Sequence, residues 1–177
     1  MRLLLCGDSL VARLERRLEL LSICRMPNHW ILSFDGRPGV RVRDFINQPP
    51  LLYPMPDVVF LVLGGNDVGL APPYQIVNSI IQLCDLLHHS GVDCVGSILP
   101  RSRPIGLSQR QYVSVTARTI NRELGRVFAF SDVEAFCTIR GFRRVYRGSD
   151  GVHLSLQGER WLLTRIFSRV LRYVHPA

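Results

Sequence analysis

The run DVVFLVLG, residues 57–64, places the strongest constraint on the fold of this chain. The run is short, rich in β-branched residues and apolar at consecutive positions, so both of its faces must be covered by other parts of the protein. Such a segment is typical of a central strand in a parallel sheet that carries helices on its two faces. The run therefore predicts an α/β fold.

The rest of the chain alternates short apolar runs with longer segments of helical spacing. This alternation predicts a five-stranded parallel sheet in a three-layer α/β/α sandwich. At 177 residues, a single domain covering residues 1–177 is expected, and its start directly on a strand indicates a domain of a longer protein. The other four strands are expected at residues 2–6, 30–34, 92–99 and 126–130, and the helices at 11–24, 74–89, 108–125 and 155–174.

The chain has a net charge of +8, and all 22 of its basic residues are arginines. Two interpretations stay open: a solvated basic surface, or a surface that binds RNA, DNA or an anionic membrane through guanidinium groups. No recognisable nucleic-acid-binding motif accompanies the charge. No apolar run approaches the roughly 18 residues of a membrane-spanning helix, so no transmembrane segment is expected.

The five cysteines are odd in number, and no Cys-x-x-Cys motif occurs among them. These features favour free thiols in a reducing compartment, and therefore a cytoplasmic location. Cys84 and His88 are one helical turn apart, which is half of a possible metal site, but no second pair matches them. We therefore expect neither a metal ion nor another cofactor.

Residues of unusual type follow three of the expected strands: GDSL at 7–10, DGRPG at 35–39 and GGND at 64–67. The carboxyl ends of parallel strands meet at one edge of a sheet, where α/β proteins bind their ligands. We therefore expect these loops to surround a crevice. Two Pro-rich segments, NQPPLLYPMP at 47–56 and LPRSRP at 99–104, are expected to be long connections near it.

The segment SDGVHLS, residues 149–155, brings Asp150 and His153 to the same turn. A serine hydroxyl is a poor nucleophile until a base takes its proton, and His153 can serve Ser9 in this way. Asp150 can orient the imidazole and stabilise its charged form. The other histidines have no such neighbours and are interpreted as surface or helix-end residues: His29, His88, His89 and His175.

Acyl transfer also needs hydrogen-bond donors for the oxyanion of its tetrahedral intermediate. The expected donors are the backbone N–H of Ser9 at a helix start, the backbone N–H of Gly39, and the side-chain amide of Asn66. Each residue also has an ordinary explanation as a helix cap, a turn glycine or a loop cap. All of these explanations holding at once is less plausible than one catalytic site.

These segments resemble the four sequence blocks of the SGNH (GDSL-type) hydrolases, in the order of that family. GDSL matches the nucleophile block, FDGRPG at 34–39 the glycine block, LGGND at 63–67 the asparagine block, and SDGVHLS the Asp-x-x-His block. The helical segment INREL, residues 120–124, is also similar to a pattern of the family. Phe34 departs from the family pattern, because many members have Asn there.

The resemblance implies a flavodoxin-like SGNH hydrolase fold and a metal-independent serine esterase that prefers short acyl groups. It implies Ser9, His153 and Asp150 as the catalytic triad, with Ser9, Gly39 and Asn66 as the oxyanion hole. Arg101 and Arg103 follow the fourth expected strand and are expected to line the crevice. The substrate is then a small acyl ester or a lipid.

Finer features, such as GDSLV, LGGNDVG and ILPRSRP, are similar to the esterase domains in first-open-reading-frame proteins of some animal non-LTR retrotransposons. Two alternatives to an active enzyme stay open. One is a retired hydrolase fold that binds nucleic acid. The other is a lipid-binding module whose loop PPLLYPMP, residues 49–56, inserts into a bilayer. The sequence does not indicate an oligomeric state.

Overall fold

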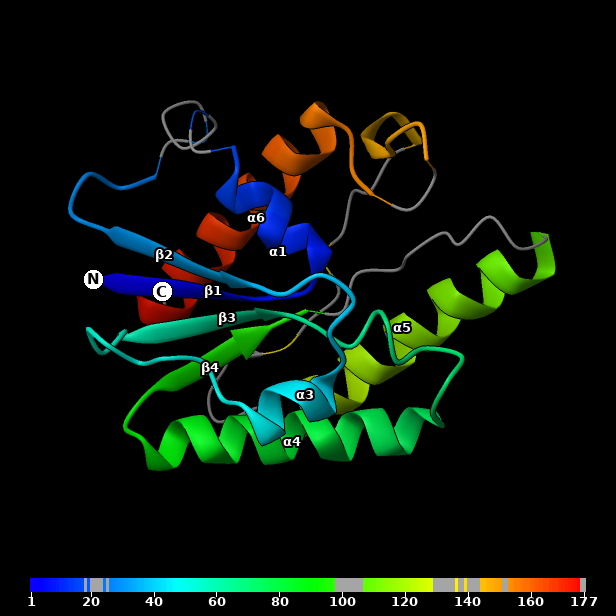
Figure 1. The fold of residues 1–177 in the computed structure, drawn as a ribbon, viewed down its shortest axis with the longest axis horizontal. Helices are drawn as coiled ribbons and strands as arrows, with labels where there is room; N and C mark the ends of the chain where they lie inside the picture. The colour runs from blue at the N-terminus through cyan, green and yellow to red at the C-terminus, as the bar shows by residue number, and fades with distance from the viewer. Residues whose placement is uncertain are drawn as a thin grey trace.

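Figure 1 shows the fold in a computed structural model of the chain, which describes residues 1–17, 19, 24, 26–97, 107–128, 136, 139, 144–150 and 153–175. Within these residues one sheet has the strand order β2-β1-β3-β4, and all neighbouring strands are parallel. Every residue of β3 is buried, as the run at 57–64 predicts. The strands are β1 (Arg2–Gly7), β2 (Ile31–Gly36), β3 (Val58–Val62) and β4 (Asp93–Gly96).

Helices cover both faces of the sheet, so the predicted three-layer α/β/α architecture is confirmed (Figure 1). Because side chains alternate along a strand, Leu3 and Leu5 of β1 pack in one core and Leu4 and Cys6 in the other. The first core lies against α1 (Ser9–Glu15) and α6 (Leu156–Val174). The second lies against α3 (Val42–Asn47), α4 (Pro73–His89) and α5 (Leu107–Val127).

Two glycines at the carboxyl ends of strands permit close packing there. A Cβ atom on Gly7 would lie 2.3 Å from the backbone oxygen of Val62, and one on Gly36 would lie 2.2 Å from the backbone nitrogen of Ala12. Both distances are far below van der Waals contact, so a larger residue would push β1 from β3, or α1 from β2. Glycine therefore sets how closely the loops at this edge approach one another.

The helices α4, α5 and α6 confirm the expected helical segments to within about two residues at their ends. The first helix, expected at 11–24, covers Ser9–Glu15 instead, and Glu19 is helical again after a turn. The chain turns at Arg16, and the Arg17 side chain points to the buried Glu159 of α6. Helix α3 was not expected, because six residues are too few to display a helical period.

The strand expected at residues 126–130 is wrong in its first part. Arg126 and Val127 belong to α5, since the apolar stripe of Ile120, Leu124 and Phe128 continues the helix toward the core. Residues 129 and 130 lie outside the described part. Phe136 forms a parallel bridge with Gly96 of β4, so the chain pairs with that strand later in the sequence than expected.

The Pro-rich segment at 47–56 begins at the end of α3, beside the loop after β2, but it leads away from the expected crevice. It leads to the amino end of β3, where the Asp57 N–H donates a hydrogen bond to the Arg2 carbonyl, 2.9 Å away. Its far end is therefore at the sheet edge opposite the expected crevice, with Leu51 and Tyr53 about fully exposed. The second Pro-rich segment, 99–104, lies outside the described residues. Among the described helices, none has the length and hydropathy needed to span a membrane.

Candidate active site

The loops expected to surround a crevice follow strands at the point where the strand order of the sheet reverses. From β1 the chain moves outward to β2, then returns across β1 to β3 and β4. The loops that follow β1 and β3 therefore depart on opposite faces, and such switch points are the usual ligand sites of α/β sheets. Ser9 follows β1 and Asn66 follows β3, so both belong to this point.

The structure brings Ser9, His153 and Asp150 together. The Nε2 atom of His153 is 3.2 Å from the Oγ atom of Ser9, and its Nδ1 atom is 2.6 Å from Oδ2 of Asp150. Asp150 also accepts a hydrogen bond from the His153 backbone N–H through Oδ1, at 2.9 Å. One carboxylate thus fixes both the backbone and the ring of the histidine, and the opposite ring nitrogen faces the serine.

Ser9 is placed by the junction between β1 and α1. Asp8 is buried and is the N-cap of α1, accepting a hydrogen bond from the Leu10 N–H at 3.0 Å. Its own backbone N–H donates to the Val62 carbonyl of β3. A capped start fixes the first turn of the helix, so the hydroxyl of Ser9 has a defined position at the end of the sheet.

His153 is placed by the segment that precedes α6. The Gly148 N–H donates to the His153 carbonyl at 2.8 Å, and the Ser155 N–H donates to the Tyr146 carbonyl at 2.9 Å. Ser155 also caps α6, accepting a hydrogen bond from the Gly158 N–H. These bonds tie the histidine turn to the 3-10 helix η1 (Arg144–Tyr146) on one side and to a long helix on the other.

An ion-pair cluster joins α1, which begins at Ser9, to α6, which begins three residues after His153. Glu159 of α6 is 2% exposed, and its carboxylate lies 3.3 Å from Arg13 Nε of α1 and 3.5 Å from Arg17 Nε. The two arginines are 39% and 44% exposed, so they bring positive charge from the surface to a buried carboxylate. The cluster fixes α1 against α6, and therefore the nucleophile loop against the histidine turn.

Gly39 has a φ angle of +77°, in the left-handed region that glycine adopts without strain. A Cβ atom built there would meet nothing within 4 Å. Backbone conformation thus accounts for the glycine at this position. The loop carrying Gly39 lies beside the end of β1, because the Arg37 N–H donates to the Gly7 carbonyl at 2.9 Å.

Asn66 is buried, and its Nδ2 atom donates a hydrogen bond to the Val40 carbonyl at 2.8 Å. This bond brings the amide group to the residue that follows Gly39. A primary amide nitrogen carries two hydrogens and can donate to two acceptors. The Gly39 loop thus contacts both the end of β1, which leads to Ser9, and the side chain of Asn66.

Asp67 belongs to the same cluster, although the sequence analysis gave it no role. Its Oδ2 atom accepts a hydrogen bond from the Val42 N–H, at the start of α3, at 3.3 Å. Burial raises the pKa of Asp67 from 3.8 to about 6; the Val42 hydrogen bond and the charge of Arg41 oppose this rise, and Asp44 adds to it. Its position next to Asn66 in GGND was the signal by which Asp67 could have been found.

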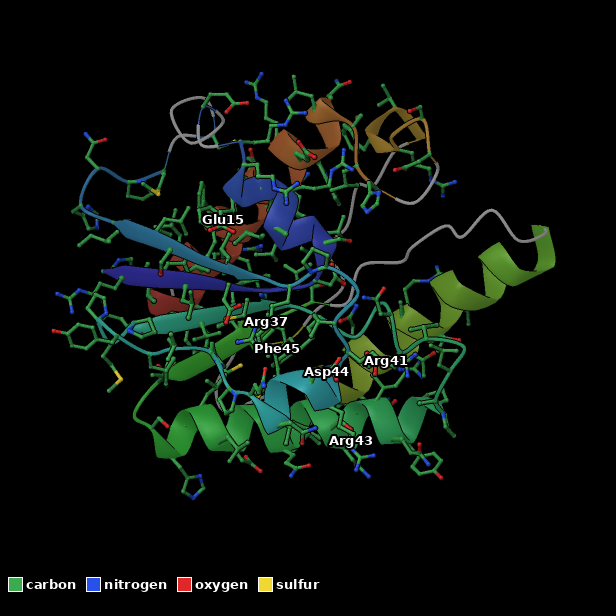
Figure 2. All side chains as sticks on the ribbon, viewed as in Figure 1. Glu15, Arg37, Arg41, Arg43, Asp44 and Phe45 are labelled. Atoms are coloured by element: carbon green, nitrogen blue, oxygen red, sulfur yellow. The ribbon has the colours of Figure 1, made fainter. Side chains whose placement is uncertain are left out.

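Arg37 was also missed, although DGRPG contains it. Its guanidinium group donates two hydrogen bonds to Asp35, at 2.7 and 2.8 Å, and a third to the Gln48 carbonyl. It also lies over the ring of Phe45, 4.3 Å from the centroid (Figure 2). The hydrogen bonds to Asp35 raise the pKa of Arg37. This arginine therefore fixes the loop after β2 against α3.

The remaining expected residues are outside this cluster. Arg101 and Arg103 lie outside the described residues. The histidines at 29, 88, 89 and 175 are exposed, as expected. Cys84 has its Sγ atom 3.1 Å from that of Cys94, and both are free thiols. In the described part of the chain, no three histidine, cysteine or acidic side chains gather around a possible metal position.

Neither the protein-family models nor the curated proteins match this sequence. Solved structures do match its fold. A carbohydrate esterase family 3 protein from Talaromyces cellulolyticus is 15% identical, with a TM-score of 0.70 over 100% of this chain and 99% of that one. A member of the lipolytic G-D-S-L family from Veillonella parvula is 15% identical, with a TM-score of 0.68 over 97% and 99%. An acetyl esterase mutant with an acetate ion is 14% identical, with a TM-score of 0.66 over 98% of both chains.

Proposed function

We propose that this chain, which has the fold of the SGNH (GDSL-type) hydrolases, is a serine esterase that hydrolyses short-chain acyl esters. The observation that carries the proposal is the chain of contacts from Ser9 Oγ through both ring nitrogens of His153 to Asp150. A serine, a histidine and a carboxylate in this order form the arrangement that makes a hydroxyl nucleophilic. A fold retired from catalysis has no need to keep it.

In this mechanism Ser9 Oγ attacks the ester carbonyl while His153 Nε2 takes its proton. Asp150 keeps the proton on Nδ1, so that Nε2 is the basic nitrogen, and it stabilises the imidazolium that forms. The histidine then gives its proton to the leaving alcohol, and the acyl group stays on Ser9. Water, activated by the same nitrogen, hydrolyses the acyl-enzyme and restores the serine.

The negative charge of each tetrahedral intermediate falls on the former carbonyl oxygen. We assign its stabilisation to the backbone N–H groups of Ser9 and Gly39 and to the amide of Asn66. Fixed donors of this kind stabilise the transition state more than the substrate, and the loss of one typically lowers kcat by about 10²–10³. The buried position of Asn66 and its bond to Val40 support a fixed donor.

The preference for short acyl groups rests on two observations. Several solved structures of the same fold carry the names of acetyl, acetyl xylan or carbohydrate esterases. Two of the loops around Ser9 are also short: one residue separates β1 from α1, and five separate β2 from α3, whereas ten separate β3 from α4. Such loops leave little chain to enclose a long acyl group.

The proposal is tested with nitrophenyl esters from acetyl to palmitoyl, using the purified protein and its Ser9→Ala and His153→Ala forms. We expect acetyl and butyryl esters to be hydrolysed fastest, and each variant to fold normally but lose several orders of magnitude in kcat. A preference for palmitoyl esters contradicts the acyl-length proposal. Turnover that survives in Ser9→Ala contradicts the mechanism. An inactive wild type that binds RNA in a salt-sensitive manner favours the nucleic-acid-binding alternative.

A further inference from the structure

Two adjacent side chains of the loop after β3 reach across to the loop after β2. Asn66 Nδ2 donates to the Val40 carbonyl at 2.8 Å, and the Val42 N–H donates to Asp67 Oδ2 at 3.3 Å. The two bonds attach to backbone groups one and three residues after Gly39. They therefore hold the loop that carries one proposed oxyanion donor against the loop that carries another.

We propose that Asp67 is a positioning residue of the oxyanion hole, which holds the Gly39 loop in register with Asn66. The inference rests on the proposed esterase function, and it assigns Asp67 no contact with substrate. Asp67 acts through the backbone of Val42, at the junction between the Gly39 loop and α3.

The anchoring of the Gly39 loop shows why such a contact matters. On its amino side the loop is bound to the nucleophile region through the Arg37 N–H and the Gly7 carbonyl. On its carboxyl side it is bound to the other loop through Asn66 and Asp67. A fixed donor stabilises an oxyanion only when it is held within a fraction of an ångström of its place. Loss of the Asp67 contact therefore leaves the Gly39 N–H less well placed.

The charge of Asp67 supports a role beyond holding the helix. Burial disfavours the carboxylate, as its raised pKa shows, and Asp44 nearby adds repulsion. An ionised acceptor forms a stronger hydrogen bond than a neutral one, so the charge tightens the contact while it lowers stability. Charged groups kept at such a cost gather at functional sites.

The chain offers a matched control in Asp44. Its Oδ2 atom accepts a hydrogen bond from the Arg41 N–H at 2.7 Å, at the start of the same helix. Asp44 lies within α3 and Arg41 is the N-cap of that helix, so this bond joins the helix to the end of the Gly39 loop and not to the Asn66 loop. Figure 2 labels Asp44 and Arg41 beside each other at this helix. Asp44→Ala therefore removes a helix cap and leaves the contact between the loops intact.

The first measurement compares kcat and KM for an acetyl ester. We expect Asp67→Ala to lower kcat about tenfold with KM within twofold, because an imprecise oxyanion donor costs part of the ~10²–10³ that a full donor supplies. Asp67→Asn keeps an acceptor oxygen and should stay within about threefold of the wild type. Asp44→Ala should change kcat by less than twofold. Equal losses in Asp67→Ala and Asp44→Ala would overturn the proposal.

A double-mutant cycle with Asn66→Ala tests whether Asp67 acts through the oxyanion hole. In the Asn66→Ala background the oxyanion hole is already impaired, so the addition of Asp67→Ala should lower kcat by less than about threefold further. An independent loss of the full tenfold would show that Asp67 affects turnover by another route, and the proposal would fail.

Amide hydrogen exchange separates failure of this inference from failure of the proposed function. We expect the Val42 N–H to exchange faster in folded Asp67→Ala than in the wild type, and at the wild-type rate in Asp44→Ala. This readout needs no turnover. An inactive wild type with this exchange pattern would refute the esterase, and the oxyanion role with it, but not the contact. An active wild type in which Asp67→Ala leaves the Val42 exchange unchanged would refute the contact alone.

Discussion

His153 Nε2 lies 3.2 Å from Ser9 Oγ, although 144 positions separate the two residues in the chain. The distance is set from both sides: Ser9 begins the helix that follows β1, and His153 precedes the helix that packs on the same face of the sheet. The parallel sheet and its two helices therefore build the contact. The predictions below follow from this geometry and from the groups that maintain it.

Asp150→Asn should preserve the fold and lower kcat by about 10⁴, as the loss of the carboxylate does in other triads. Asn can hold the imidazole but does not fix the proton on Nδ1 or stabilise the imidazolium. The half-exposed position of Asp150 keeps the cost in stability small. Steady-state kinetics with an acetyl ester checks the rate, and circular dichroism checks the fold. A folded variant with undiminished kcat would mean that the turn at 149–155 has no catalytic role.

The Glu159 ion-pair cluster predicts that loss of the carboxylate lowers the stability of the protein less than loss of the two arginines. Glu159→Gln leaves Arg13 and Arg17 partly exposed, so both can be hydrated, and the loss should be about 1–2 kcal/mol, below the ~3–5 kcal/mol typical of broken buried pairs. The double variant Arg13→Ala with Arg17→Ala strands a buried carboxylate and should lose more. Urea unfolding at pH 7 measures both. The opposite order would show that the arginines contribute little to the contact between α1 and α6.

Asp67→Asn should raise stability in a pH-dependent way. The pKa of Asp67 is about 6 in the folded protein and 3.8 ordinarily, so the folded state holds this proton more tightly. The contribution of the protonated Asp67 to the free energy of unfolding is therefore complete below about pH 4, and it is lost as the pH rises through about 6. The Tm advantage of Asp67→Asn should be larger at pH 8 than at pH 4.5. Because the two proteins share all other carboxylates, this difference isolates Asp67, and a difference that does not vary with pH would contradict the raised pKa.

Gly39→Ala should destabilise the protein by about 1–2 kcal/mol, the usual cost of a left-handed conformation for a residue with a Cβ atom. The added methyl group meets no atom within 4 Å, so backbone strain is the expected cause. We also expect kcat to fall, since relief of the strain shifts the Gly39 N–H. Urea unfolding and acetyl-ester kinetics test the two effects, and an unchanged stability would contradict the assigned φ angle.

Much of this fold could be predicted from the sequence, because a strand buried on both faces requires helices on both sides of it. That Ser9, His153 and Asp150 lie close together could also be predicted, from the sequence blocks that contain them, whereas their catalytic roles stay predictions. Helix α3 could not, because its six residues show no period. The fifth strand was misplaced, because Phe128 extends the apolar stripe of α5 past the expected helix end. Asp67 contacts the backbone of Val42, and Arg37 contacts Asp35, Phe45 and the Gln48 carbonyl; residue type alone does not reveal these contacts.

Several expectations stay predictions. They include the roles of Arg101 and Arg103, the binding of nucleic acid or membrane through arginines, the cytoplasmic location, and the likeness to retrotransposon esterase domains. The single-domain organisation of residues 1–177 also belongs with them. Each concerns residues outside the described part of the chain, or partners and surroundings beyond it.

The central claim is that Ser9 is an activated nucleophile. Its most direct test is labelling with an alkyl phosphonate ester, which bonds to an activated serine and mimics the tetrahedral intermediate, followed by peptide mass spectrometry. We predict one phosphonyl group per chain, located on Ser9, with loss of ester hydrolysis in proportion to labelling and no labelling in His153→Ala. Label on another residue, or full hydrolytic activity in a protein labelled at Ser9, would contradict the claim.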